Sequence, residues 1–179
     1  MQEAAAVLIS FTISINSLPA FAESLEQVPV LGKLVEVLQF TGGSAGGGTI
    51  QDGADVKFIT LKTRGESDQL VLDFASPDEG QTMASSYNVK FTEYPYTMMV
   101  TVSGARKFSA ARDLETLKNS RYVRDAYPLI TLDDSAIRFN ITFKEPVAYE
   151  VKEYKDPAQV VITLKPGKER AETSVYYRS

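Results

Sequence analysis

From residue 49 onward, apolar and polar residues alternate with a period of two, and this pattern predicts a mainly β protein. In residues 136–143, AIRFNITF, the apolar members Ile137, Phe139, Ile141 and Phe143 alternate with polar residues, as in a strand with one buried face. Similar runs occur at residues 56–62, 69–75, 88–94, 97–104, 122–132, 147–154 and 159–165, separated by turn-forming sequences. About seven or eight short antiparallel strands at this spacing predict a β-sandwich.

One segment departs from this alternation. In residues 108–120, FSAARDLETLKNS, the spacing of Ala110, Leu114 and Leu117 places them on one face of a helix, and Ser109 is a suitable capping residue. We therefore expect one short helix inserted between two strands.

The first 22 residues form an apolar segment, interrupted by Pro19, that ends in Ala20-Phe21-Ala22. That ending is typical of a signal-peptide cleavage site, but no Lys or Arg precedes the apolar run. We expect a partial transmembrane span, with residues 23–179 outside the cytoplasm of a single-pass cell-membrane protein. Secretion after cleavage at Ala22, and a buried N-terminal helix, are the alternatives.

Two further segments precede the alternating part. Residues 23–41 contain Leu31, Leu34, Val35 and Leu38 at helical spacing, which predicts a juxtamembrane amphipathic helix that docks on the following domain or lies on a membrane surface. Residues 42–48, GGSAGGG, have the composition of a flexible linker. The domain prediction is then a β-sandwich over 49–166 and a polar tail over 167–179.

The composition excludes several kinds of chemistry. The 179 residues include neither Cys nor His, so disulfides, thiolate nucleophiles, Ser-His-Asp triads and imidazole metal ligands cannot form. The formal net charge of −4 does not favour nucleic acid as a partner. We expect no metal ion and no cofactor.

Residues 17–40 resemble the juxtamembrane region of single-pass anti-sigma-factor-like proteins of Gram-positive bacteria. The resemblance rests on Pro19-Ala20-Phe21-Ala22 and on the later Pro29, Val30, Leu31, Gly32, Leu34 and Val35. It implies that a sigma factor would be a partner only through a region upstream of this sequence.

The β part is similar to AMIN-type domains, which are small β-sandwiches of cell-envelope proteins. The similarity rests on the run QLVLDF and on Asp156, Pro157 and Ala158 before the last alternating run. Together the two resemblances imply anchoring, sensing and binding of envelope material, and they imply no catalytic residues.

Basic and aromatic residues supply the candidate ligand contacts. The candidates are Arg106, Lys107, Arg112, Arg121, Arg124 and Tyr122, together with Tyr94 and Tyr96 of the sequence EYPYT. Arg and Lys would pair with phosphate or carboxylate groups, and Tyr would stack on sugar rings. The alternative is structural, because ordinary ion pairs on a helix surface and half-buried strand tyrosines produce the same pattern.

The function predicted from the sequence is a non-enzymatic extracytoplasmic sensory or binding domain that recognises a cell-wall polymer or an envelope protein. One alternative is a carboxylate-dependent envelope hydrolase, for which the available groups are Asp73, Glu93, Asp133, Asp134, Glu150 and Glu153. The other is a structural interaction module that pairs with a partner through an exposed edge strand.

Overall fold

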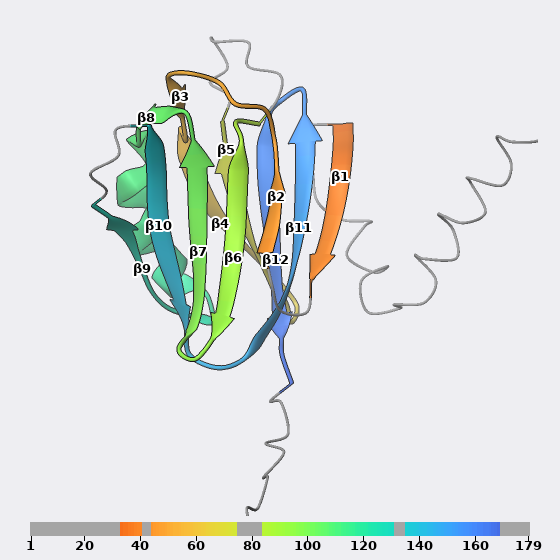
Figure 1. The fold of residues 1–179 in the computed structure, drawn as a ribbon. Helices are drawn as coiled ribbons and strands as arrows, with labels where there is room; N and C mark the ends of the chain where they lie inside the picture. Colours follow the sequence, from red (N-terminus) through yellow and green to blue (C-terminus); the bar gives the residue numbers. More distant parts are fainter. Residues whose placement is uncertain (1–32, 41–43, 75–83, 131–134, 169–179) are drawn as a thin grey trace, which may run out of the picture. The chain divides into compact units, whose positions relative to one another are not determined.

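The computed structural model describes residues 33–40, 44–74, 84–130 and 135–168, which form a mainly β structure with one short helix (Figure 1). The elements are, in chain order, β1 (Lys33–Phe40), β2 (Ser44–Gly47), β3 (Ala54–Asp55), β4 (Phe58–Arg64), β5 (Ser67–Asp73), β6 (Tyr87–Glu93), β7 (Tyr96–Ser103), β8 (Ala105–Lys107), the 3₁₀ helix η2 (Ser109–Asn119), β9 (Val123–Leu129), β10 (Ala136–Phe143), β11 (Val147–Lys155) and β12 (Gln159–Pro166). All eight strands that the alternation predicts are confirmed, with boundaries shifted by a few residues.

The long strands form two five-stranded antiparallel sheets that face each other across one core. One sheet has the order β1-β11-β12-β5-β4 and the other the order β2-β6-β7-β10-β9, while β3 and β8 make a small parallel pair. Figure 1 shows the two sheets in a sandwich-like arrangement, with β6, β7 and β10 in front of β12 and β5. The prediction of an antiparallel, layered β fold is therefore confirmed at this level.

The core lies between the sheets because each sheet places alternate side chains on its inner face. On β10, Ile137, Phe139, Ile141 and Phe143 are all buried, in agreement with the predicted alternation. They belong to one hydrophobic cluster with inward residues of the opposite sheet, including Leu70, Leu72, Val160, Ile162 and Leu164. A single shared core of this kind makes the two sheets one folding unit.

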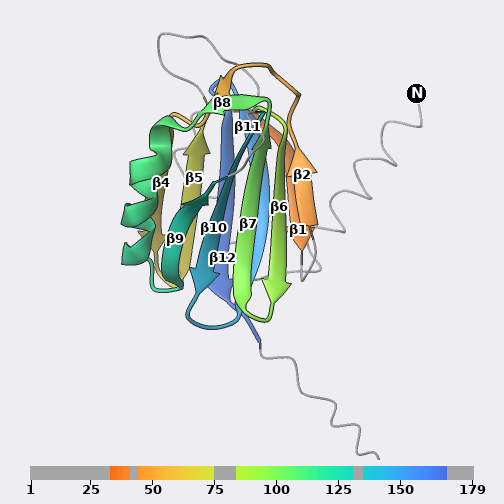
Figure 2. The same cartoon turned by 60° about the vertical axis from the view of Figure 1, so that its left-hand side comes forward.

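Helix η2 covers the side of the molecule where β4 and β9 are the edge strands (Figure 2). Its Ala110, Leu114 and Leu117 are buried, so the predicted helical face is confirmed. The prediction that Ser109 caps the helix is wrong, because Ser109 is the first helical residue and the N-cap residue is Phe108, which makes no side-chain capping hydrogen bond. Instead, Asp55 accepts hydrogen bonds from the Ser109 backbone N–H at 2.9 Å and from Ser109 Oγ at 2.7 Å.

Two more aspartates attach η2 to the sheet that contains β4 and β5. Asp113 Oδ2 accepts a hydrogen bond from the backbone N–H of Ile59 on β4 at 3.0 Å. At the other end of the helix, Asp68 Oδ2 on β5 accepts one from Ser120 Oγ at 2.6 Å. The helix is thus fastened by carboxylates that satisfy backbone and hydroxyl donors, in addition to its buried apolar face.

The structure corrects the prediction of a helix over residues 23–41 for the part that it describes, because Lys33–Phe40 is strand β1. This strand pairs with β11 in an antiparallel register from Lys33 opposite Lys155 to Phe40 opposite Tyr149, with an irregularity after Leu34. The helical spacing of the leucines expresses only a local preference. Pairing with β1 provides hydrogen-bond partners for the backbone of β11 along its length.

The prediction of a linker over residues 42–48 is also wrong, since Ser44–Gly47 is strand β2 and pairs with β6. Its glycines serve close packing here. A Cβ atom on Gly46 would lie 3.0 Å from the carbonyl oxygen of Tyr87, and one on Gly47 would lie 2.6 Å from Glu153 Oε2. Absence of side chains therefore allows β2 to approach its neighbours.

The predicted span over residues 1–22 lies outside the described residues, as do most of the predicted tail and residues 23–32. Within the ranges given above, no helix has the length and apolar character needed to cross a bilayer.

Candidate binding groove

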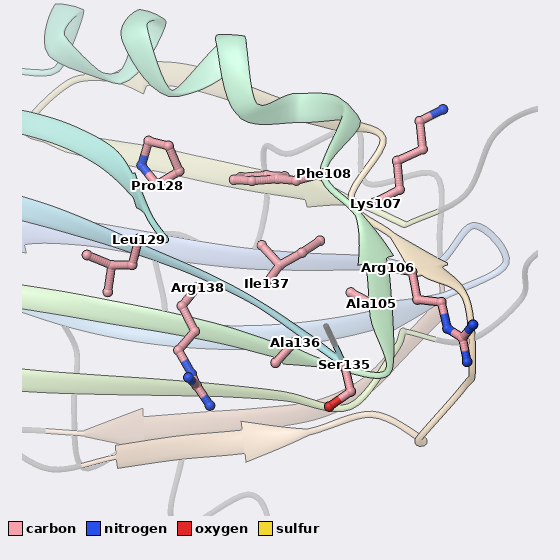
Figure 3. A pocket seen from close by; sticks show the side chains of 10 residues that line it. All are labelled: Ala105, Arg106, Lys107, Phe108, Pro128, Leu129, Ser135, Ala136, Ile137 and Arg138. Carbon is pink, nitrogen blue, oxygen red and sulfur yellow. The ribbon is translucent and has the colours of Figure 1, made fainter. Parts of the chain in front are cut away.

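An open groove lies at one end of the molecule, between β8, the end of β9 and the start of β10 (Figure 3). Its volume is about 640 Å³, and residues 105–108, 128–129 and 135–138 line it. Three separate segments of the chain therefore meet there, and only the folded sheet brings them together.

Gly104 creates this arrangement by turning the chain out of β7 and into β8. It has a positive φ of 75°, its backbone N–H donates to the Ser135 carbonyl at 2.7 Å, and its own carbonyl accepts from Gly53 N–H at 2.9 Å. A Cβ atom at this position would lie 2.2 Å from the carbonyl oxygen of Gln51. Only glycine fits both the backbone conformation and the close contact.

The floor of the groove is apolar. The Phe108 ring stacks on the core residue Phe139 with ring centroids 5.5 Å apart, and Ile137 is buried beside it. Figure 3 shows Phe108, Ile137, Pro128 and Leu129 gathered around this floor. An aromatic ring fixed by stacking offers a rigid surface for a sugar ring or an aliphatic group.

Two arginines border the floor, and they differ in how they are held. Arg106 forms a two-pronged pair with Asp52, with Nε 2.9 Å from Oδ1 and Nη2 3.0 Å from Oδ2. Arg138 projects from β10 on the other side of the groove (Figure 3). Lys107 is exposed and its side chain points away from the apolar floor (Figure 3). No carboxylate is among the lining residues themselves, although Asp52 beside the groove neutralises the charge of Arg106.

The groove continues onto the outer face of the sheet, by which we mean the side chains of β6, β7, β9 and β10 that point away from the core. Cross-strand pairing places Leu129, Arg138, Thr101 and Asn88 in one row across these strands. The next row contains Tyr127, Asn140, Met99 and Lys90. Hydroxyl, amide, aromatic and cationic groups thus alternate over a surface that begins at the groove.

The outer face is positively charged although the chain as a whole has a net charge of −4. Lys90 and Arg138 are its cations within the rows just described. In the adjoining row, Asp125 lies opposite Thr142, and its Oδ1 is 3.1 Å from Lys118 Nζ. Lys118 Nζ is also 2.9 Å from Glu115 Oε2, so it offsets Asp125 only in part, and the excess of positive charge on the face comes from Lys90 and Arg138 against the single carboxylate of Asp125.

The structure brings together only two of the predicted basic contacts, Arg106 and Lys107, in the groove. Arg112 on η2 and Arg124 on β9 are exposed outside it. Arg121 makes contacts within the fold. Its backbone N–H donates to Asp68 Oδ2 at 3.0 Å, and its guanidinium lies 5.9 Å from the centroid of the Tyr122 ring. Arg138 was missed by the sequence analysis, although its polar position in the alternating run AIRFNITF already marked it as outward-facing.

The predicted tyrosine contacts are distributed differently. The prediction that Tyr122 contacts a ligand is wrong, because the residue is only 1% exposed and its hydroxyl donates a hydrogen bond to the Glu66 carbonyl. Tyr94 is 74% exposed and its ring centroid lies 5.8 Å from that of Tyr96, in the hairpin between β6 and β7. That hairpin is at the opposite end of the strands from the groove (Figure 1).

The described candidate carboxylates do not form a site in the groove. Asp73 accepts a hydrogen bond from Gln159 Nε2 at 2.6 Å, and burial raises its pKa against the lowering effects of that bond and of the Lys62 charge. Glu150 is buried, and its Oε2 lies 3.1 Å from Lys152 Nζ. Glu153 is also buried, and its Oε2 accepts a hydrogen bond from the Gly48 backbone N–H at 3.0 Å. Glu93 ends β6, at the hairpin end of the sheet, and does not line the groove.

Asp133 and Asp134 lie outside the described residues. Within the part of the chain that is described, no three carboxylates gather as potential metal ligands. No protein-family model matches this chain, and no curated protein sequence matches it.

Proposed function

We propose that this chain is a non-enzymatic binding domain of the bacterial cell envelope, a β-sandwich of the AMIN-like kind, which recognises an anionic cell-wall polymer. The proposal includes the expected N-terminal membrane segment and an extracytoplasmic location, as the anti-sigma-factor-like resemblance implies. The observation that supports it is the continuous surface formed by the groove and the outer face, where Arg138 belongs to both.

The spacing of the cations suits a polymer with repeated charges. Lys90 and Arg138 are two strands apart and one row apart on the outer face. Strand spacing and rise per residue place their Cα atoms about 12 Å apart. A small anion would engage one of them, whereas a chain of phosphate or uronate groups would engage both and would rest its sugar rings on Tyr127 and the groove floor.

Strand addition at β4 or β9 is a weaker explanation, because these two edge strands are blocked on the side that η2 covers. On β4, the Ile59 N–H is already bonded to Asp113. On β9, the Ala126 N–H is bonded to Asp125 Oδ1 at 2.9 Å, and Pro128 has no N–H to offer. Charges and prolines at edges are common means of preventing strand pairing. These contacts favour binding on the sheet face.

The test is co-sedimentation of the full chain with purified Gram-positive cell walls, before and after acid extraction of their anionic polymers. The variant Lys90→Gln/Arg138→Gln removes both cations of the outer face. The control Lys62→Gln/Arg64→Gln removes the same two types of charge from β4 of the other sheet. Two lost charge-assisted contacts, each contributing about 1.5–3 kcal/mol, predict an affinity weaker by about a hundredfold or more for the first variant.

We expect the wild type and the control to pellet with intact walls and to remain in the supernatant with extracted walls. Equal binding by both double variants would refute the role of the outer face. Release of soluble glycan fragments by the wild type would favour the hydrolase alternative instead.

A further inference from the structure

Exposed apolar side chains are concentrated at the end of the molecule that carries β8, which is the upper end in Figure 1. In the described part of the chain, six large apolar or aromatic side chains are exposed. Four of them are near this end: Leu34 (46%), Ile50 (76%), Phe58 (54%) and Ile130 (99%). Isolated exposed apolar residues are common, but their concentration at one end requires a reason.

Strand pairing fixes the position of each of these residues. Leu34 lies at the start of β1 opposite Tyr154 of β11, and Phe58 starts β4 opposite Asp73 at the end of β5. Ile130 directly follows β9, and Ile50 lies in the connection from β2 to β3. They occur on both sheets at the same end, so they surround an end surface and do not line a single cleft.

Lysines accompany these apolar residues. Lys33 and Lys155 are exposed and lie opposite each other in the pairing of β1 with β11, and Lys107 is exposed at the end of β8. Exposed apolar residues and lysines at the same end of a domain form a combination found where proteins rest on lipid surfaces, because apolar groups enter the acyl boundary while ammonium groups remain among the phosphates.

The place where the N-terminal segment joins the domain also indicates a membrane as the partner. Lys33 is the first residue of β1, so residues 1–32, with their apolar run at 4–22, join the domain at this end. If that run enters a bilayer as expected, the end of the domain nearest to the bilayer along the chain is the one that exposes Ile50 and Ile130.

We infer that this end is a bilayer-contact surface, with Ile50 and Ile130 inserted at the boundary between headgroups and acyl chains of an anionic phospholipid membrane. With this end on the bilayer, the strands run away from the lipid, so the part of the outer face beyond the groove, with Lys90 and Tyr127, remains free to bind the polymer proposed above. The inference rests on the membrane segment of the proposed function and not on polymer binding, and its surface adjoins the groove, since Lys107 lines the groove and Ile130 follows Leu129.

The absence of tryptophan from this chain allows a direct test. The full-length variant Ile130→Trp introduces one fluorophore at the proposed contact, and the control variant Tyr94→Trp introduces one at an exposed position at the opposite end. Each variant is mixed with vesicles of phosphatidylcholine and phosphatidylglycerol, with and without lipids brominated on the acyl chains. Flotation measures how much protein is bound.

We expect both variants to float with the vesicles, and only Ile130→Trp to show a blue-shifted emission that brominated lipids quench. An insertion depth of about 5–10 Å is sufficient for quenching. Flotation without quenching of Ile130→Trp would overturn the inference, because the apolar N-terminal run alone would then account for binding. Quenching of both variants, or failure of the chain to float, would overturn it as well.

Discussion

The most informative stability test concerns Asp68, which is completely buried on β5 and connects the end of η2 to the sheet. Its Oδ2 accepts hydrogen bonds from Ser120 Oγ at 2.6 Å and from the Arg121 backbone N–H at 3.0 Å. The Ser120 hydroxyl oxygen in turn accepts the Tyr122 backbone N–H at 3.1 Å. One carboxylate therefore organises the whole connection from η2 to β9.

The variant Asp68→Ala leaves the Ser120 hydroxyl and the Arg121 N–H without an acceptor. A buried polar group left unsatisfied costs about 1–3 kcal/mol, and removal of a buried charge returns part of this cost. We therefore expect a loss of about 2–5 kcal/mol in the free energy of unfolding. The variant Asp68→Asn keeps one carbonyl oxygen for both donors, and it should lose less than about 1.5 kcal/mol.

Urea unfolding of the full chain, followed by circular dichroism, measures these differences. Asp52→Ala is the matched control, because Asp52 pairs with Arg106 on the surface with side chains 78% and 67% exposed, and such a pair contributes about 0–1 kcal/mol. A loss below 1 kcal/mol for Asp68→Ala, on the order of the control, would refute the reasoning. Equal losses for Asp68→Ala and Asp68→Asn would show that charge, and not the two hydrogen bonds, stabilises this connection.

Two other predictions follow from single features. Gly104→Ala should destabilise the protein by about 1–3 kcal/mol and disturb the groove, because the φ of Gly104 is 75° and a Cβ would lie 2.2 Å from the Gln51 carbonyl oxygen. Thermal unfolding measures this loss, and an unchanged midpoint would contradict the prediction. Burial raises the pKa of Tyr122, Tyr149 and Tyr154 above 10, and the Glu150 charge adds to the effect at Tyr154. Stability from these phenols is complete below pH 10 and declines as pH rises through their folded pKa values; absorbance at 295 nm should show tyrosines that ionise later in the folded than in the unfolded chain.

The candidate site could be predicted only in part. Arg106 and Lys107 stand next to each other in the sequence and were found as part of a basic segment, but nothing local connects them with Arg138 or Leu129. Tyr122 belongs to the same basic segment, yet its ring is in the core, because the connection after η2 turns inward at Asp68. Proximity along the chain was therefore a poor guide to which side chains share a surface.

The sequence by itself determined the strands and the helical face, because alternation in AIRFNITF and the spacing of Ala110, Leu114 and Leu117 report directly which side chains are buried. Tertiary structure alone decided the state of residues 33–40 and 44–47, where leucine spacing favours a helix and glycine composition favours a linker. Both segments became strands because β11 and β6 offered them backbone partners, and hydrogen bonds between strands distant in the chain outweigh such local preferences. The groove has the same origin, since a surface made by three separate segments exists only once the sheets have assembled.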